Sequence, residues 1–133
     1  MKKRIFFVVF LVLLMASMTA YATNETYGLW SFPNSLSSHT TNTRNYKTDD
    51  ENKAYFSVSG GTGLSLDNTI GARVHRWSDN VQVSSQIRLK GNTAYRVTSQ
   101  YVGATPSVLT ALYMRMGYSS AGQACSASGT WCP

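Results

Sequence analysis

Residues 81–90 read VQVSSQIRLK, and this stretch decides the fold class. Its apolar side chains all fall at odd positions: Val81, Val83, Ile87 and Leu89. A period of two places these side chains on one face of a strand and the polar ones on the other. Gly91-Asn92 follows as a two-residue turn, and residues 93–102 alternate again. We therefore predict an antiparallel hairpin formed by 81–90 and 93–102.

Further strands are expected on both sides of this hairpin. Five more stretches have strand character: 27–32, 54–59, 70–77, 108–118 and 126–131. The stretch 108–118 is apolar on both faces, which predicts a central strand. Residues 34–53 are polar and predict a long loop with room for an edge strand around 43–47. Short strands, frequent turn residues and no helical period indicate an all-β protein, a small antiparallel β-sandwich of jelly-roll type.

The first 22 residues resemble a cleavable signal peptide. Lys2, Lys3 and Arg4 precede an apolar run over 5–15, and Ala20 and Ala22 stand where a signal peptidase needs small residues. The run has 11 residues, whereas a membrane span needs about 20. An uncleaved anchor is the alternative. We predict secretion of one domain, residues 23–133, into the extracellular space.

The charge of the predicted mature chain is modest and unevenly spread. Nine basic and six acidic residues give residues 23–133 a net charge of +3, against +6 for the whole chain. The stretch 23–72 has net −2 and 73–133 has net +5. Net charge alone therefore does not predict nucleic-acid binding. The step can mark a surface that meets an anionic partner, or it can reflect ordinary solvated strand faces.

Two cysteines lie close together near the end of the chain. Cys125 and Cys132 stand in CSASGTWC, and in an oxidising compartment such a pair favours a disulfide. Two cysteines without a neighbouring histidine are a poor zinc site. We expect a Cys125–Cys132 bridge and no bound metal or cofactor.

Three segments carry a resemblance to a known family. They are NYKTDDENKAYFSVSG (45–60), ALYMRMGYSS (111–120) and SASGTWCP (126–133). Together they resemble the small secreted proteins of Gram-positive bacteria grouped as the domain-of-unknown-function family DUF2712. The resemblance implies a signal peptide and an all-β body, and it brings no activity. A small polar residue is expected where Cys132 stands, so the bridge would be particular to this chain.

Few residues support catalysis or metal binding. His39 and His75 are the only histidines, and no G-x-S-x-G nucleophile pattern occurs. Asp49, Asp50 and Glu51 lack the alternate spacing of a calcium loop. We expect a loop cluster of solvated acids, and a protein that is not an enzyme.

The most suggestive group of side chains is basic and aromatic. If 70–77, 81–90 and 93–102 are neighbouring strands, their outward faces carry Arg73, His75, Trp77, Arg88, Lys90 and Arg96. Arginine binds phosphate with two hydrogen bonds, and an exposed tryptophan can stack on a sugar ring. The competing interpretation is a set of charges that keep strands soluble and block edge pairing.

These observations favour a binding protein. We expect a secreted, non-enzymatic β-sandwich that binds a cell-envelope or extracellular anionic polymer, such as cell-wall polymer, or a membrane surface. The alternative is a bacteriocin-like effector that acts on neighbouring cells, since such proteins are often small, cationic and exported.

Overall fold

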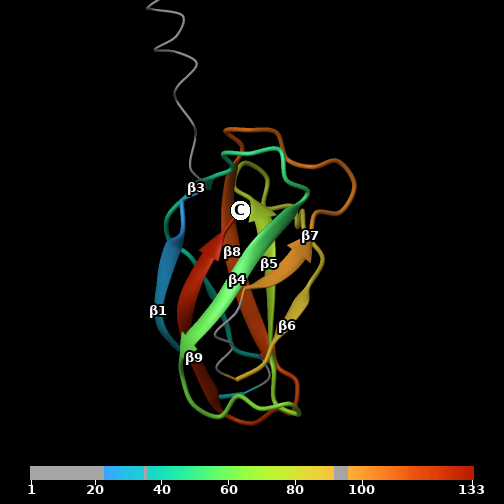
Figure 1. The fold of residues 1–133 in the computed structure, drawn as a ribbon. Helices are drawn as coiled ribbons and strands as arrows, with labels where there is room; N and C mark the ends of the chain where they lie inside the picture. Colours follow the sequence, from blue (N-terminus) through green and yellow to red (C-terminus); the bar gives the residue numbers. More distant parts are fainter. Residues whose placement is uncertain (1–22, 35, 92–95) are drawn as a thin grey trace, which may run out of the picture.

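The computed structural model describes residues 23–34, 36–91 and 96–133 (Figure 1). These residues form nine strands and no helix. The strands are β1 (Glu25–Phe32), β2 (Ser38–Thr40), β3 (Asn45–Tyr46), β4 (Lys53–Gly60), β5 (Ile70–Arg76), β6 (Ile87–Leu89), β7 (Val97–Gln100), β8 (Ala111–Ser119) and β9 (Cys125–Cys132). The described ranges accordingly contain no helix that could cross a membrane. The predicted signal peptide lies outside them.

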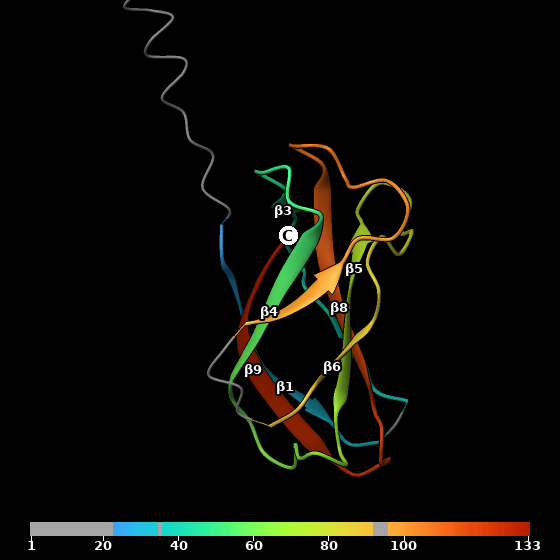
Figure 2. The same ribbon diagram turned by 45° about the vertical axis from the view of Figure 1, so that its right-hand side comes forward.

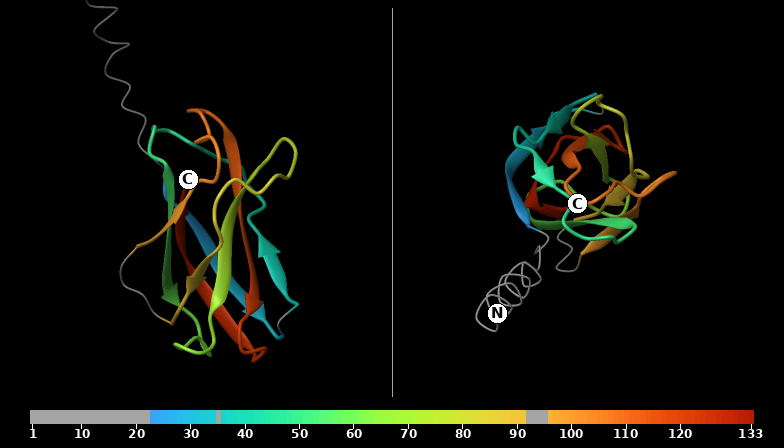
Figure 3. Two further views of the ribbon diagram at one scale, coloured as in Figure 1. Left: turned by 90° about the vertical axis from the view of Figure 1, so that its right-hand side faces the viewer. Right: turned by 90° about the horizontal axis from the view of Figure 1, so that it is seen from above.

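The strands form two antiparallel sheets that pack face to face, as the view from above in Figure 3 shows. Sheet A has the order β1-β9-β4-β7, and sheet B has the order β2-β8-β5-β6, with the short β3 also paired to β8. The partners β1–β9, β2–β8, β4–β7 and β5–β6 are nested along the chain. The chain is therefore folded in half like one long hairpin and then rolled up, which is a jelly roll. The all-β sandwich prediction is confirmed.

The predicted hairpin of 81–90 with 93–102 is wrong. Strand β6 pairs with β5 in sheet B, and β7 pairs with β4 in sheet A, so the two belong to different layers (Figure 2). Among the described residues, the bridge Ser84↔Tyr101 and its neighbouring hydrogen bonds join the two segments directly. Alternation identifies a strand with one buried face, but it does not identify the partner strand. The proposed turn falls partly on residues 92–95, outside the described ranges.

The core lies between the two sheets and follows the predicted alternation. Three alternate residues on each of β4, β5 and β8 point inward and are almost completely buried: Ala54, Phe56, Val58, Ile70, Ala72, Val74, Leu112, Met114 and Met116. Strand β8 is central, as predicted, but only its even positions face the core, so Tyr113 and Arg115 belong to the outer face.

The polar segment 34–53 contains two short strands instead of one. Both β2 and β3 pair with β8 and end sheet B on that side. Their polar sequence suits this position, because an edge strand has only one neighbour and keeps much of its surface in solvent. The expected edge strand around 43–47 corresponds to β3.

The expected disulfide is wrong. No disulfide links Cys125 to Cys132, and the two stand at opposite ends of the same strand, β9. Seven residue steps of extended chain separate their Cα atoms by about 23 Å, whereas a disulfide needs less than about 7 Å. Both side chains are buried. Sequence proximity was misleading here, because the segment between them is a strand and not a loop.

Candidate functional site

The outer face of sheet B carries the candidate site. Odd-numbered residues of β5 and β8 point away from the core and meet as cross-strand pairs. From one end of the sheet to the other these pairs are Gly71↔Gly117, Arg73↔Arg115 and His75↔Tyr113, followed by Trp77 bonded to Ala111. Successive pairs are about 6.7 Å apart along the strands. We call this face a ladder. The pair Gly71↔Gly117 is its glycine step and the pair Arg73↔Arg115 is its arginine step, while the pair His75↔Tyr113 and the residue Trp77 are its two aromatic steps.

The arginine step places two like charges directly opposite each other. Arg73 donates from Nη1 to Gln86 Oε1 at 2.7 Å and from Nε to His75 Nε2 at 3.2 Å. Arg115 Nε is buried and has no hydrogen-bond partner among the described residues. Like charges at opposed positions destabilise a sheet by up to about 1 kcal/mol. This step therefore concentrates positive charge that an anion would neutralise.

The aromatic steps form the floor of an open hollow of about 360 Å³. Tyr113 stacks on His75 with ring centroids 5.3 Å apart, and it meets the edge of Trp77 at 5.7 Å. Arg44, from the loop between β2 and β3, lies over the Trp77 ring at 5.4 Å. Trp77 is 40% exposed. Flat rings held by neighbours and open to solvent are suited to stacking on a sugar.

The turn after β5 positions these rings. Asn80 has a positive φ of 60°, a conformation that asparagine adopts more readily than most residues. Its carbonyl oxygen bonds to His75 Nδ1 at 3.0 Å, and its side-chain oxygen accepts from the Tyr113 hydroxyl. The Arg76–Asp79 ion pair, at 2.6 Å, closes the same turn. One turn residue thereby fixes two rings of the site.

His75 is held in its neutral form. Because Nε2 accepts from Arg73, the ring proton is on Nδ1, which donates to Asn80. Burial lowers the pKa of His75, and the nearby charges of Arg73 and Arg115 lower it further, although the Asn80 carbonyl opposes them. The ring therefore adds packing without adding charge near neutral pH.

The glycine step opens into a second hollow, of about 450 Å³, at the other end of the face. It is lined by Thr69, Gly71, Gln86, Arg88 and Ser120. A Cβ at residue 71 would lie 2.4 Å from Gln86 Nε2. The glycine is thus required for the side chain of Gln86 to lie across the strand and meet Arg73.

The predicted site residues are divided between the two sheets. Arg73, Trp77 and Arg88 lie on the sheet B face described above, and Lys90 is exposed just after β6. Arg96 lies beside sheet A, with its guanidinium 5.5 Å from the Tyr55 ring and bonded to Asn24. The prediction that all of these share one face is therefore wrong for Arg96, because β7 joins the other sheet.

Arg44, Tyr113 and Arg115 were missed. The interpretation of 108–118 as apolar on both faces hides the alternation of Tyr113 and Arg115 against Leu112, Met114 and Met116. That alternation is visible in the sequence and could have placed both residues outward. The position of Arg44 depends on the path of a loop, for which the sequence carries no comparable signal.

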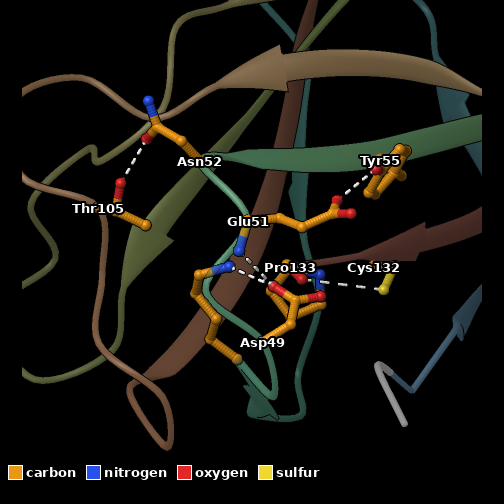
Figure 4. A network of polar contacts seen from close by, with 8 residues as sticks. Asp49, Glu51, Asn52, Tyr55, Thr105, Cys132 and Pro133 are labelled. Atoms are coloured by element: carbon orange, nitrogen blue, oxygen red, sulfur yellow. Dashed lines mark hydrogen bonds and ion pairs between the residues drawn. The ribbon is translucent and has the colours of Figure 1, made fainter.

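The acidic loop is occupied with contacts of its own (Figure 4). Asp49 accepts from Lys47 Nζ at 2.8 Å, and Lys47 is completely buried. Glu51 accepts from the Tyr55 hydroxyl. At the same end of the sandwich Thr105 donates to Asn52 at 2.6 Å, and Cys132 lies next to Pro133. The carboxylates of this loop thus neutralise Lys47 and orient Tyr55, on the sheet A side of the molecule.

Comparisons with known proteins add no relative. No family model matches the chain, no curated protein matches it, and no solved structure matches it. The resemblance to DUF2712 stays a prediction.

The sheet B face thus combines guanidinium groups and aromatic rings in defined positions. Guanidinium groups at its centre can bind a phosphate, sulfate or carboxylate group, and rings at one end can stack on a neighbouring sugar. The neutral His75 is linked to Arg73 and Asn80, and neither contact supplies the carboxylate partner of a catalytic triad.

Proposed function

We propose that this protein is a secreted, non-enzymatic jelly roll whose sheet B face binds an anionic sugar polymer outside the cell. The observation that carries the proposal is the cross-strand pair Arg73↔Arg115. Two arginines in register reduce the stability of the free protein, and a bound anion would relieve their repulsion. A surface that served only solubility would gain nothing from this arrangement.

The distribution of carboxylates supports this assignment. Glu25 accepts from Trp131, Asp49 from Lys47, Glu51 from Tyr55, and Asp79 from Arg76. Each of these four carboxylates therefore has a partner of its own, while Arg73 donates to the amide oxygen of Gln86 and to His75. Four of the six carboxylates of the chain are thus engaged outside the Arg73↔Arg115 pair.

A polymer fits the face better than a small ion does. From Gly71 to Trp77 the ladder is about 20 Å long, and a hollow opens at each end of it. Anionic groups would meet Arg73, Arg88 and Arg115, while the Tyr113 and Trp77 rings would stack on sugar units. The combination of charge and stacking favours a charged glycan over a smooth membrane surface.

A pair of matched polymers tests the proposal. Dextran sulfate and unmodified dextran share one sugar backbone and differ in charge, so titration of the exported domain (23–133) with each isolates the anionic contribution. We expect binding to dextran sulfate that weakens as salt rises, because screening acts over about 8 Å at 0.15 M, and much weaker binding to dextran. Equal binding to both polymers would contradict the proposal. Stronger binding to anionic vesicles or to a DNA oligonucleotide than to dextran sulfate would reassign the face.

A further inference from the structure

We infer a second sugar-binding site in the groove between β1 and the loop that follows β2, and we assign to it an uncharged sugar ring. We call this the side groove. It has a volume of about 200 Å³ and is lined by Glu25, Thr26, Tyr27, Gly28 and Trp30 of β1 and by Thr40, Thr41, Asn42 and Thr43. The inference rests on the proposed function, because it names the neighbouring unit of the same polymer.

A β-bulge turns Trp30 toward the side groove. The register of β1 on β9 shifts between Tyr27 and Trp30, where Gly28 and Leu29 intervene. In a regular strand residues 27 and 30 would lie on opposite faces, but the extra residue places Trp30 on the side of Tyr27 and Phe32. Bulges of this kind redirect side chains next to binding sites.

The Trp30 ring is held in place before any ligand arrives. It stacks on His39 with centroids 5.4 Å apart and an interplanar angle of 15°, and it lies 5.1 Å from the Tyr27 ring. His39 is fixed in turn by a 2.8 Å hydrogen bond to the Ser31 carbonyl and by edge contact with Phe32 at 5.0 Å. A ring that is already immobile loses little entropy on binding.

The polar lining of the side groove differs from that of the sheet B face. Threonine hydroxyls and one carboxylate, Glu25, line it, and no basic side chain does so in the part of the chain that the structure describes. Hydroxyl and carboxylate oxygens accept hydrogen bonds from sugar hydroxyls, whereas the carboxylate repels a phosphate or sulfate. The volume and the lining together suit one uncharged ring stacked on Trp30.

The two sites are neighbours. Thr40, Thr41 and Asn42 line both the side groove and the hollow above Tyr113. A chain lying on Tyr113 and Trp77 therefore needs to pass only this ridge to reach Trp30. The polymer would then present a charged unit to the arginine step and an uncharged unit to the side groove.

Neutral hexasaccharides test the side groove separately from the charged face. Maltohexaose, cellohexaose and chitohexaose are titrated into the ¹⁵N-labelled domain and followed by amide chemical shifts. We expect at least one to shift β1 and the 40–43 loop. Trp30→Ala should weaken this binding about tenfold or more by removing the stacking platform. Gly28→Gln is the second variant, and it should also weaken this binding because residue 28 lines the side groove. A Cβ at residue 28 meets no atom within 4 Å, so the fold should be kept.

The matched control is Arg73→Gln combined with Arg115→Gln, which should leave neutral-sugar binding unchanged. The proposal that the side groove binds an uncharged sugar would be contradicted by shifts confined to the amides around Tyr113. It would also be contradicted if none of the three sugars caused a shift at millimolar concentration. Either result leaves the dextran sulfate experiment unaffected. Failure of the wild-type domain to bind dextran sulfate is the separate sign that the proposed function itself has failed.

Discussion

Arg73 on β5 and Arg115 on β8 are direct cross-strand partners on the outer face of sheet B. We expect Arg115→Thr to raise the free energy of unfolding by about 0.5 kcal/mol, because the change removes a like-charge pair and suits an extended backbone. Urea unfolding at low salt measures the effect. A loss of more than about 1 kcal/mol would mean that Arg115 stabilises the fold, and the argument for a functional pair would fail.

We predict that the stability of the fold does not depend on oxidation of Cys125 and Cys132. Native protein should react slowly with a maleimide, since both thiols are buried and burial raises the pKa of Cys132, which disfavours its thiolate. After unfolding under non-reducing conditions, mass spectrometry should find two labelled thiols. A product that is two mass units lighter and carries no label would show that a disulfide links the two cysteines. It would contradict their placement at opposite ends of β9.

Stability should depend on pH through His75. The pKa of His75 is lowered in the folded protein from the ordinary value of 6.5. Below about pH 6.5 the histidine of the unfolded chain is therefore protonated to a greater extent than His75 of the folded chain. The free energy of unfolding should therefore fall as pH decreases from 7.5 to 5.0. His75→Gln should flatten this slope. Unfolding curves of the two proteins that change in parallel would show that His75 makes no contribution.

The same histidine should link proton binding to anion binding. Protonated His75 would add a positive charge beside Arg73 and Arg115 and would give up the hydrogen bond that it accepts from Arg73. Affinity for dextran sulfate, whose charge is constant over this range, should rise from pH 7.5 to 5.0 in the wild type and rise less in His75→Gln. An identical pH dependence of affinity in the two proteins would exclude this linkage.

Two glycines of sheet A test the close packing of the roll. A Cβ at Gly129 on β9 would lie 2.0 Å from the Ser57 carbonyl oxygen, whereas one at Gly28 on β1 meets no atom within 4 Å. Gly129→Ala should cost about 3 kcal/mol of unfolding free energy through overpacking. Gly28→Ala should leave stability nearly unchanged. Similar melting temperatures for the two variants would contradict the pairing of β9 with β4.

The sequence predicted the strands well and their partners poorly. Alternation in 54–59 and 70–77 corresponds to β4 and β5, because one buried face imposes a period of two wherever the strand lies. Partner choice in a jelly roll depends on contacts between distant segments, such as β1 with β9, and leaves no local signal. The short distance in sequence between Cys125 and Cys132 misled for the same reason.

The candidate site was predictable in part. Arg73, Trp77 and Arg88 follow from alternation alone, and the structure places them on one sheet face. Arg96 was assigned to that face through the assumed hairpin and moved to sheet A with β7. Trp30 could not be placed in the side groove from the sequence, since its direction depends on a bulge.

The proposed function requires that the sheet B face, and not positive charge in general, binds an anionic sugar polymer. Two double variants remove the same charge from different faces: Arg73→Gln with Arg115→Gln on sheet B, and Lys53→Gln with Arg96→Gln beside Tyr55 on sheet A. The measurement is calorimetric titration with dextran sulfate at 0.15 M salt. We predict that the sheet B pair weakens binding about tenfold or more and the sheet A pair about twofold or less. Equal losses in the two variants would contradict the account.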